Sequence, residues 1–194
     1  MMVLEFCKVR FKKLLDKKKR IFDRKKTNSI NIRTELSYED LHLVNDLTYH
    51  EIEYLMNEDY KIVYQQDLYG KKNHYLIRPP SNESLQHCFL VQIIKQVLKN
   101  NFEDVRDYGT RGPDIVFRIR NKFIALEIET GKVLSRNRKR FLEKIKSLKR
   151  NYGGDWFIIV TNRNFLGKYG KFGKTVSRKN FLKKLSSYVS FDIE

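Results

Sequence analysis

The chain has 194 residues, of which 41% are hydrophobic and 13% aromatic, so it can fold around one good core, alone or with a small extra module. Its 40 lysines and arginines against 23 aspartates and glutamates give a formal charge of +17, which favours a polyanionic partner, DNA above all. Cys7 and Cys88 lack CxxC spacing, which argues against a zinc site and for a reducing compartment. The chain has neither an apolar run long enough for a membrane span nor a signal-peptide core, so we expect a cytoplasmic, intracellular protein without a membrane partner.

Residues 1–34 form a predicted basic arm. Apolar residues recur at helical spacing between Val3 and Lys26, and the same stretch is crowded with lysine and arginine. A basic amphipathic helix can have a solvated charged face, contact a phosphate backbone or lie on a membrane. The solvated face is the default interpretation, DNA contact comes next and membrane binding last.

Residues 35–79 form a predicted acidic module. The stretch 35–60 holds eight acidic residues and no lysine or arginine. Ser37 and Thr48 are expected to cap two short helices, each with an acid three residues on, and residues 60–78 to form a hairpin. Two short helices and a hairpin resemble a winged-helix module, but the second helix carries acids where DNA would need bases. We therefore expect a protein contact, either a homodimer interface or a docking surface for the basic arm.

The proline pair Pro79-Pro80 marks the next boundary. A long helix is expected from near Asn82, because two apolar stripes run along it and a helix that is apolar on two sides is buried. A strand is expected around Val105.

A hairpin is predicted between Pro113 and Lys132, from two alternating apolar stretches separated by a short turn. With Asn121-Lys122 as the turn, Asp114 faces Glu129, and Glu127 shares their side of the hairpin. Two carboxylates about 5 Å apart repel by roughly 3 kcal/mol at an effective dielectric near 20. Mg²⁺ or Mn²⁺ would relieve this repulsion. The alternative is an ordinary solvated face, neutralised by Arg118 and nearby lysines.

Pro113-Asp114, followed by the run Glu127-Ile128-Glu129-Thr130-Gly131-Lys132, resembles the signature of the PD-(D/E)xK nuclease superfamily. That superfamily includes restriction endonucleases and archaeal Holliday junction resolvases, and the small nucleases of archaeal viruses and plasmids are the nearest relatives we suggest. The resemblance covers residues 80–161. It implies an α/β fold with a mixed sheet, namely a restriction-endonuclease-like αβββαβ core within residues 80–194, and it makes Asp114 and Glu127 metal ligands.

The chain departs from that signature at Glu129, which stands where the motif has lysine. Three explanations are open: Lys132 supplies the ammonium from a shifted position, Glu129 acts as a carboxylate base, or the site has lost activity. The resemblance also implies an acid on the preceding helix near the metal, and Glu83 is the candidate third carboxylate. A first-turn acid favoured by the helix dipole is an equally good account of Glu83.

A second helix is expected from a cap at Ser135 to about Arg150, with a basic outer face that includes Lys144. The apolar run at residues 156–160 is typical of a buried parallel strand. In the basic tail, between residues 163 and 184, glycines are interleaved with aromatic residues and lysines. This composition suggests a flexible loop that contacts a nucleic-acid strand. A last helix is expected to close the chain. The residues expected to contact DNA are Arg136, Arg138, Lys139, Arg140, Lys168, Lys171 and Lys174.

These observations predict a metal-dependent nuclease that hydrolyses DNA phosphodiesters, with branched or junction DNA among the candidate substrates. Its metal ligands are Asp114, Glu127 and Glu83, and its water-activating group is Glu129 or Lys132. The alternative is a non-catalytic DNA-binding or regulatory protein on the same scaffold.

Overall fold

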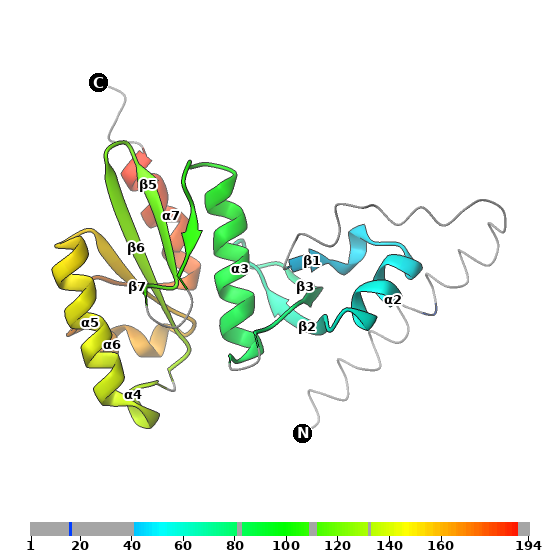
Figure 1. Ribbon diagram of the computed structural model, residues 1–194, viewed down its shortest axis with the longest axis horizontal. Helices are drawn as coiled ribbons and strands as arrows, with labels where there is room; N and C mark the ends of the chain where they lie inside the picture. The colour runs from blue at the N-terminus through cyan, green and yellow to red at the C-terminus, as the bar shows by residue number, and fades with distance from the viewer. Residues whose placement is uncertain (1–15, 17–40, 81–82, 109–111, 132, 190–194) are drawn as a thin grey trace. The chain divides into compact units, whose positions relative to one another are not determined.

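The computed structural model describes residues 16, 41–80, 83–108, 112–131 and 133–189 (Figure 1). Most of the predicted basic arm, Ser37 and Lys132 lie outside these residues. The described chain is of the α+β class, with a three-stranded and a five-stranded sheet. The chain divides into two compact units: residues 1–67 with 71–88, and residues 68–70 with 89–194. None of the described helices has the length and apolar character needed to cross a membrane.

The described part of the first unit combines a small antiparallel sheet with an α-helix and a short 3-10 helix. In chain order it contains β1 (Leu41–Leu43), the 3-10 helix η2 (Val44–Asp46), α2 (Tyr49–Asn57), β2 (Lys61–Gln66) and β3 (Lys72–Ile77), and the strand order is β1-β3-β2. The predicted capping box opens α2: Glu51 N donates to Thr48 Oγ1 at 3.3 Å, and Thr48 N donates to Glu51 Oε2 at 2.7 Å. The hairpin predicted for residues 60–78 is confirmed.

The helix expected from Ser37 does not extend through residues 41–43, which form β1 instead. This part of the prediction is wrong because a tertiary contact outweighs the local capping signal. Leu41 pairs with Ile77 of β3, and both side chains are buried. Strand pairing therefore supplies the segment with backbone hydrogen bonds and with burial that a short surface helix would lack.

The second unit carries the larger sheet. It contains most of α3 (Leu85–Lys99), β4 (Arg106–Asp107), β5 (Ile115–Ile119), β6 (Lys122–Glu129), α4 (Val133–Arg136), α5 (Arg138–Tyr152), β7 (Trp156–Val160), η3 (Arg163–Phe165), α6 (Leu166–Gly170), β8 (Thr175–Ser177) and α7 (Arg178–Val189). The strand order is β4-β5-β6-β7-β8, with antiparallel pairs up to β6 and parallel pairs from β6 to β8. The predicted order helix, three strands, helix, strand is therefore present, and β8 follows it as an additional strand.

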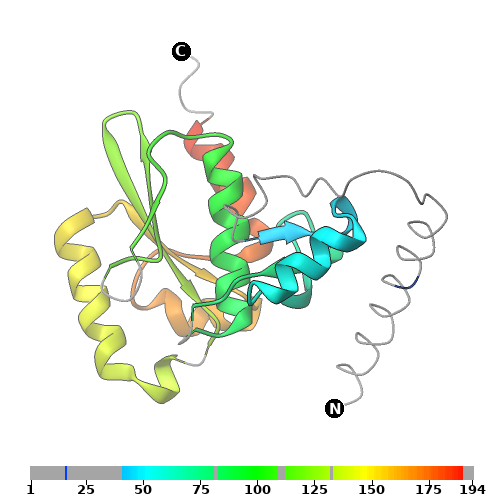
Figure 2. The same ribbon diagram turned by 45° about the vertical axis from the view of Figure 1, so that its right-hand side comes forward.

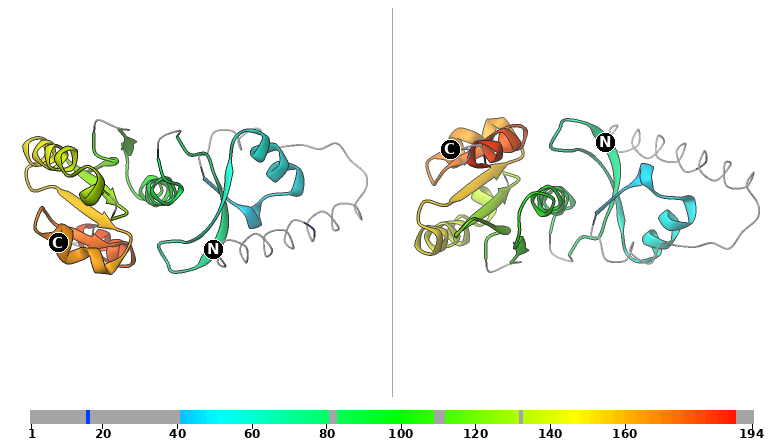
Figure 3. Two further views of the ribbon diagram at one scale, coloured as in Figure 1. Left: turned by 90° about the horizontal axis from the view of Figure 1, so that it is seen from below. Right: turned by 90° about the horizontal axis from the view of Figure 1, so that it is seen from above.

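Each face of this sheet has its own hydrophobic cluster. On one face, Ile115 and Leu126 pack with side chains of α3 and α7. On the other, Val116 and Ala125 pack with side chains of α5 and α6. Figures 2 and 3 show α5 and α7 on opposite sides of the sheet. Side chains alternate between the two faces along a strand, so Glu127 and Glu129 lie on the same face as Ala125, beneath α5.

The glycine-rich tail is folded, contrary to the flexible loop expected for it. Tyr169 of α6 is completely buried, and β8 pairs with β7. Gly173 is needed for close packing, since a Cβ atom on it would lie 2.2 Å from Trp156 Cη2. Burial and strand pairing with distant segments therefore determine a stretch that looks like a loop in the sequence.

The connection from β6 to α5 also differs in detail from the expectation. Asn137 caps α5 in place of Ser135, because Arg140 N donates to Asn137 Oδ1 at 3.3 Å and Ser135 lies within α4. Gly131 ends the strand with φ of +93°, and a Cβ atom there would lie 2.3 Å from Phe165 Cζ. Both the backbone conformation and the close approach of Phe165 require glycine at this position.

Candidate active site

The hairpin of β5 and β6 brings the first two carboxylates together. Ile119 pairs with Lys122, so the turn is Arg120-Asn121, one residue earlier than expected, and Arg120 has φ of +52°. The predicted register was therefore wrong by two residues. Because side chains alternate between the two faces of a strand, a register shift of two residues leaves each side chain on the face that was predicted for it. The shift does change the residue that faces Asp114. Ile115 pairs with Leu126, so the preceding residue, Asp114, lies opposite Glu127 and not opposite Glu129 as predicted.

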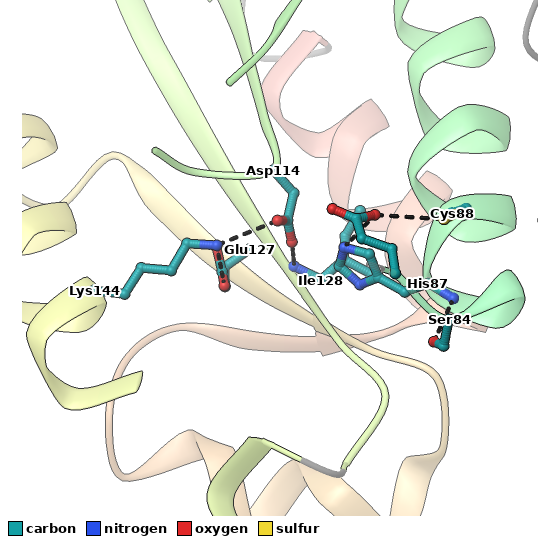
Figure 4. A network of polar contacts seen from close by, with 8 residues as sticks. Ser84, His87, Cys88, Asp114, Glu127, Ile128 and Lys144 are labelled. Carbon is teal, nitrogen blue, oxygen red and sulfur yellow. Dashed lines mark hydrogen bonds and ion pairs between the residues drawn. The ribbon is translucent and has the colours of Figure 1, made fainter. Parts of the chain in front are cut away.

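Lys144 of α5 joins these two carboxylates (Figure 4). Its Nζ lies 2.6 Å from Glu127 Oε1 and 3.2 Å from Asp114 Oδ1. The other carboxylate oxygen of Asp114 accepts a hydrogen bond from Ile128 N at 2.6 Å. The side chains of Asp114 and Glu127 are 9% and 5% exposed. Two strands and one helix thus hold two acids and one base in a nearly dry site.

Burial decides the electrostatics of this site. It raises the pKa of Glu127 well above its usual value, the nearby Asp114 raises it further, and Lys144 acts in the opposite direction. For Lys144, burial lowers the pKa, but the charges of Glu127 and Asp114 outweigh it and the net shift is upward. Lys144 is therefore a charged ammonium that partly compensates two buried acids.

One carboxylate oxygen in the site lacks a hydrogen bond. Among the described residues, Glu127 Oε2 is buried without a hydrogen-bond partner. Such an atom is costly, because its lone pairs have been removed from water without replacement. Glu127 Oε2 is therefore the oxygen of this site that could accept a further ligand.

The sequence placed Lys144 on the solvent-facing side of its helix, and this was wrong. The signal that could have located it is its spacing: it follows Phe141 by three residues and precedes Leu148 by four, so it belongs to the buried stripe. The neutralisation by Arg118 that the solvated-face alternative required is not observed. Arg118 Nη2 instead donates to the exposed Glu103 Oε2 at 3.3 Å.

Glu129 shares this face of the sheet and is engaged elsewhere in the fold. Its Oε2 accepts a hydrogen bond from Tyr169 OH at 3.1 Å in a buried setting. Burial, then the charge of Glu129, raises the pKa of Tyr169, so the phenol remains a donor. Within the described part of the chain, His, Cys, Asp and Glu side chains form no group of three suited to a metal ion. The hydrogen bond to Tyr169 separates Glu129 from the ion pairs that Lys144 makes with Asp114 and Glu127, although the charge of Glu129 still contributes to the raised pKa of Glu127.

Glu83 belongs to the first unit, and its described contacts lie one turn along the chain. Glu83 Oε2 is 3.7 Å from His87 Nε2 and accepts a hydrogen bond from Cys88 Sγ at 3.4 Å. Burial, with the hydrogen bond and charge of Glu83, raises the pKa of the Cys88 thiol to about 12. Cys88 is therefore a neutral thiol and has no nucleophilic character at ordinary pH.

The side chains expected to contact DNA are all exposed. Lys174 is held in place, since its Nζ donates to Gly154 O at 2.7 Å and lies 5.6 Å from the Phe157 ring centroid. Lys171 Nζ lies 5.3 Å from the ring centroid of Phe172. The full set is Arg136, Arg138, Lys139, Arg140, Lys168, Lys171 and Lys174.

Comparison of this chain with models of protein families, with curated proteins and with solved structures gives no match in any of the three. The case for a function therefore comes from the residues of the site and the order of the elements that carry them.

Proposed function

We propose that this protein is a metal-dependent nuclease in which Asp114 and Glu127 are the metal ligands and Lys144 takes the role of the motif lysine. The observation that supports this most is the contact of a single, partly buried ammonium with both carboxylates that the resemblance singles out. The order of elements in the second unit, with Asp114 just before β5 and Glu127 within β6, agrees with the arrangement that the resemblance implies.

The residues present fit Mg²⁺ or Mn²⁺. Mg²⁺ typically needs one or two protein carboxylates and takes its remaining ligands from water and substrate phosphate, so a third acid is not required. Glu127 Oε2 offers a buried acceptor without a hydrogen-bond partner among the described residues. A bound divalent cation would supply Lewis-acid polarisation of a phosphodiester and a lower pKa for coordinated water.

Lys144 is suited to stabilise charge and to donate a proton, and unsuited to act as a base. Its raised pKa keeps it protonated at neutral pH. In hydrolysis a water oxygen forms a bond to phosphorus and releases one proton to the solvent, while the bond to one ester oxygen breaks and that oxygen gains one proton. Once Asp114 and Glu127 have another counter-charge, the ammonium of Lys144 can stabilise the developing negative charge or donate that proton.

A non-catalytic DNA-binding protein on the same scaffold is the second candidate. It is favoured by the fact that Lys144 already compensates the two carboxylates without a metal ion. In that case the exposed basic side chains of α5 would carry the function, with sequence-independent phosphate contacts.

The deciding experiment compares cleavage of labelled duplex, single-stranded, flap and four-way-junction DNA in Mg²⁺, Mn²⁺ and EDTA. We expect metal-dependent cleavage that Asp114→Asn, Glu127→Gln and Lys144→Met each reduce by at least about 100-fold, the lower range for loss of general acid or base catalysis. Lys146→Met is the matched control, because Lys146 is an exposed lysine of the same helix. DNA binding without cleavage by the wild type, under every metal condition, would reject the nuclease in favour of the binding protein.

A further inference from the structure

A cavity of about 430 Å³ opens on the α5 side of the large sheet. Its volume lies within the roughly 300–1,000 Å³ typical of small-ligand sites. Two of its aromatic side chains are unusually exposed for large hydrophobic residues, Phe123 at 44% and Tyr108 at 46%. The lining residues are Arg106, Tyr108, Val116, Lys122, Phe123, Asn151, Tyr152 and Asp155.

The lining combines flat apolar surfaces with hydrogen-bonding groups. Phe123 and Tyr108 contribute aromatic rings and Asp155 a carboxylate. Asn151 contributes an amide that also accepts a hydrogen bond from Arg150 Nε and donates one to Ser147 Oγ. This combination suits a flat heterocycle with donors and acceptors at its edge, since a base can stack on a ring and bond to amide and carboxylate groups. The negative charge of Asp155 makes the wall unsuited to a bare phosphate, while Lys122 can contact a phosphate beside a base. Arg106 forms an ion pair with Asp104, so it would contact a phosphate through its remaining N–H groups.

The cavity lies close to the candidate active site along a single strand. Val116 lines the cavity, and it follows Asp114 by two residues, so both side chains point to the same face of the sheet. Two strand residues span about 7 Å. On the neighbouring strand Phe123 likewise shares a face with Glu127. A nucleotide whose phosphate reached Asp114 and Glu127 could therefore place an adjacent base in the cavity.

We infer that this cavity receives one unpaired nucleobase of the DNA substrate, next to the bond that is cut. The inference rests on the proposed function and narrows its substrate to DNA with an unstacked nucleotide, such as a bulge, a flap or a single strand. A perfect duplex would have to extrude a base first, which costs unstacking energy.

The test measures binding in EDTA, so that cleavage plays no part. Three probes share one sequence: a duplex with a single bulged 2-aminopurine, the same duplex with an abasic residue at the bulge, and the fully paired duplex. We expect the wild type to bind the bulged base at least about 5-fold more tightly than the abasic bulge, because stacking on an aromatic side chain contributes about 5- to 100-fold per base. Binding should also quench the 2-aminopurine fluorescence.

Phe123→Ala should abolish this preference and the quenching, and Phe123→Tyr should retain both. Tyr69→Ala is the matched control, because Tyr69 is an aromatic residue with 77% exposure that does not line the cavity. Equal wild-type affinity for the bulged base and the abasic bulge would overturn the pocket, as would an unchanged preference in Phe123→Ala. A base preference that Phe123→Ala removes, in a protein without metal-dependent cleavage, would support the pocket and reject the nuclease.

Discussion

At the scale of single residues, Lys144 controls the charge balance of the site. It places one positive charge against two buried acids, and burial keeps the pKa of Glu127 raised in spite of it. Breaking a buried ion pair costs more than the pair itself contributes, because the remaining charge is left without compensation. A change at Lys144 should therefore affect stability as well as catalysis.

We expect Lys144→Met to lower the free energy of unfolding at pH 8 by about 3 kcal/mol, the lower end of the range for broken buried pairs. The loss should be smaller at pH 5. Without the ammonium the pKa of Glu127 rises further, so the folded protein holds this proton more tightly than the unfolded chain does. The stability of the variant then falls as the pH rises above about 4.3, the usual glutamate value.

Urea unfolding of the wild type and the variant at both pH values measures this difference. Lys146→Met, on the exposed face of α5, should change stability by less than about 0.5 kcal/mol at either pH. An equal loss at pH 5 and pH 8 would mean that Glu127 is not the group left without compensation.

At the scale of elements, the glycine-rich segment after β7 is positioned by its packing against the sheet. α6 inserts Tyr169 under α5, and β8 runs parallel to β7 with Gly173 against the Trp156 ring. The hydroxyl of Tyr169 reaches Glu129, so the same element that fills the core also fixes the acid that stands at the position of the motif lysine. The segment thus contributes to the structure of the site as well as to the charge of the surface.

Gly173→Ala should force Trp156 out of its position, because the added methyl carbon would lie 2.2 Å from Trp156 Cη2. We expect a loss of about 1–3 kcal/mol in unfolding free energy, as for other overpacked sites. The chain has a single tryptophan, so a shift of its emission to longer wavelength reports the displacement directly. Gly170→Ala is the control, since nothing lies within 4 Å of a Cβ atom there. Identical emission in both variants would show that the Trp156 contact does not constrain position 173.

At the scale of the whole molecule, the formal charge of +17 is distributed unevenly. The first unit carries the acidic stretch of α2, whereas α5 presents an exposed row of bases on the sheet face that holds the candidate site. A surface of this kind binds phosphates with an affinity that falls steeply with salt. Because α5 lies on the face of the candidate site, we expect the lysines and arginines of α5 to contact the DNA phosphates.

Lys139→Ala combined with Arg140→Ala should weaken DNA binding and reduce the slope of log K against log salt concentration by about 0.9 for each phosphate that the protein no longer neutralises. Lys183→Ala combined with Lys184→Ala removes the same charge from α7, which packs on the opposite face of the sheet, and should leave the slope nearly unchanged. Fluorescence anisotropy across a range of salt concentrations provides the comparison. Equal slopes for the two double variants would show that binding depends on total charge alone.

Local patterns in the sequence were sufficient for most of the strands and for the long helices. Alternation of apolar residues locates β5 and β6, and the continuous apolar run at residues 156–160 locates β7. The Thr48 capping box locates the start of α2, and the motif spacing selects Asp114 and Glu127. Each depends on residues close together in the chain, where propensity and periodicity act directly. The faces of the hairpin also came out correctly, because the register error was an even number of residues.

Only the tertiary structure could decide which of these residues meet. The strand at Leu41–Leu43 exists through its pairing with β3, the tail folds because Tyr169 and Gly173 find buried partners, and Glu129 turns to Tyr169 forty residues later. The contact of Lys144 with Asp114 and Glu127 joins the hairpin of β5 and β6 to a helix that begins nine residues after it. These contacts are stabilised by burial and by the attraction between charges on different elements. A local sequence pattern does not predict which residues will meet in this way.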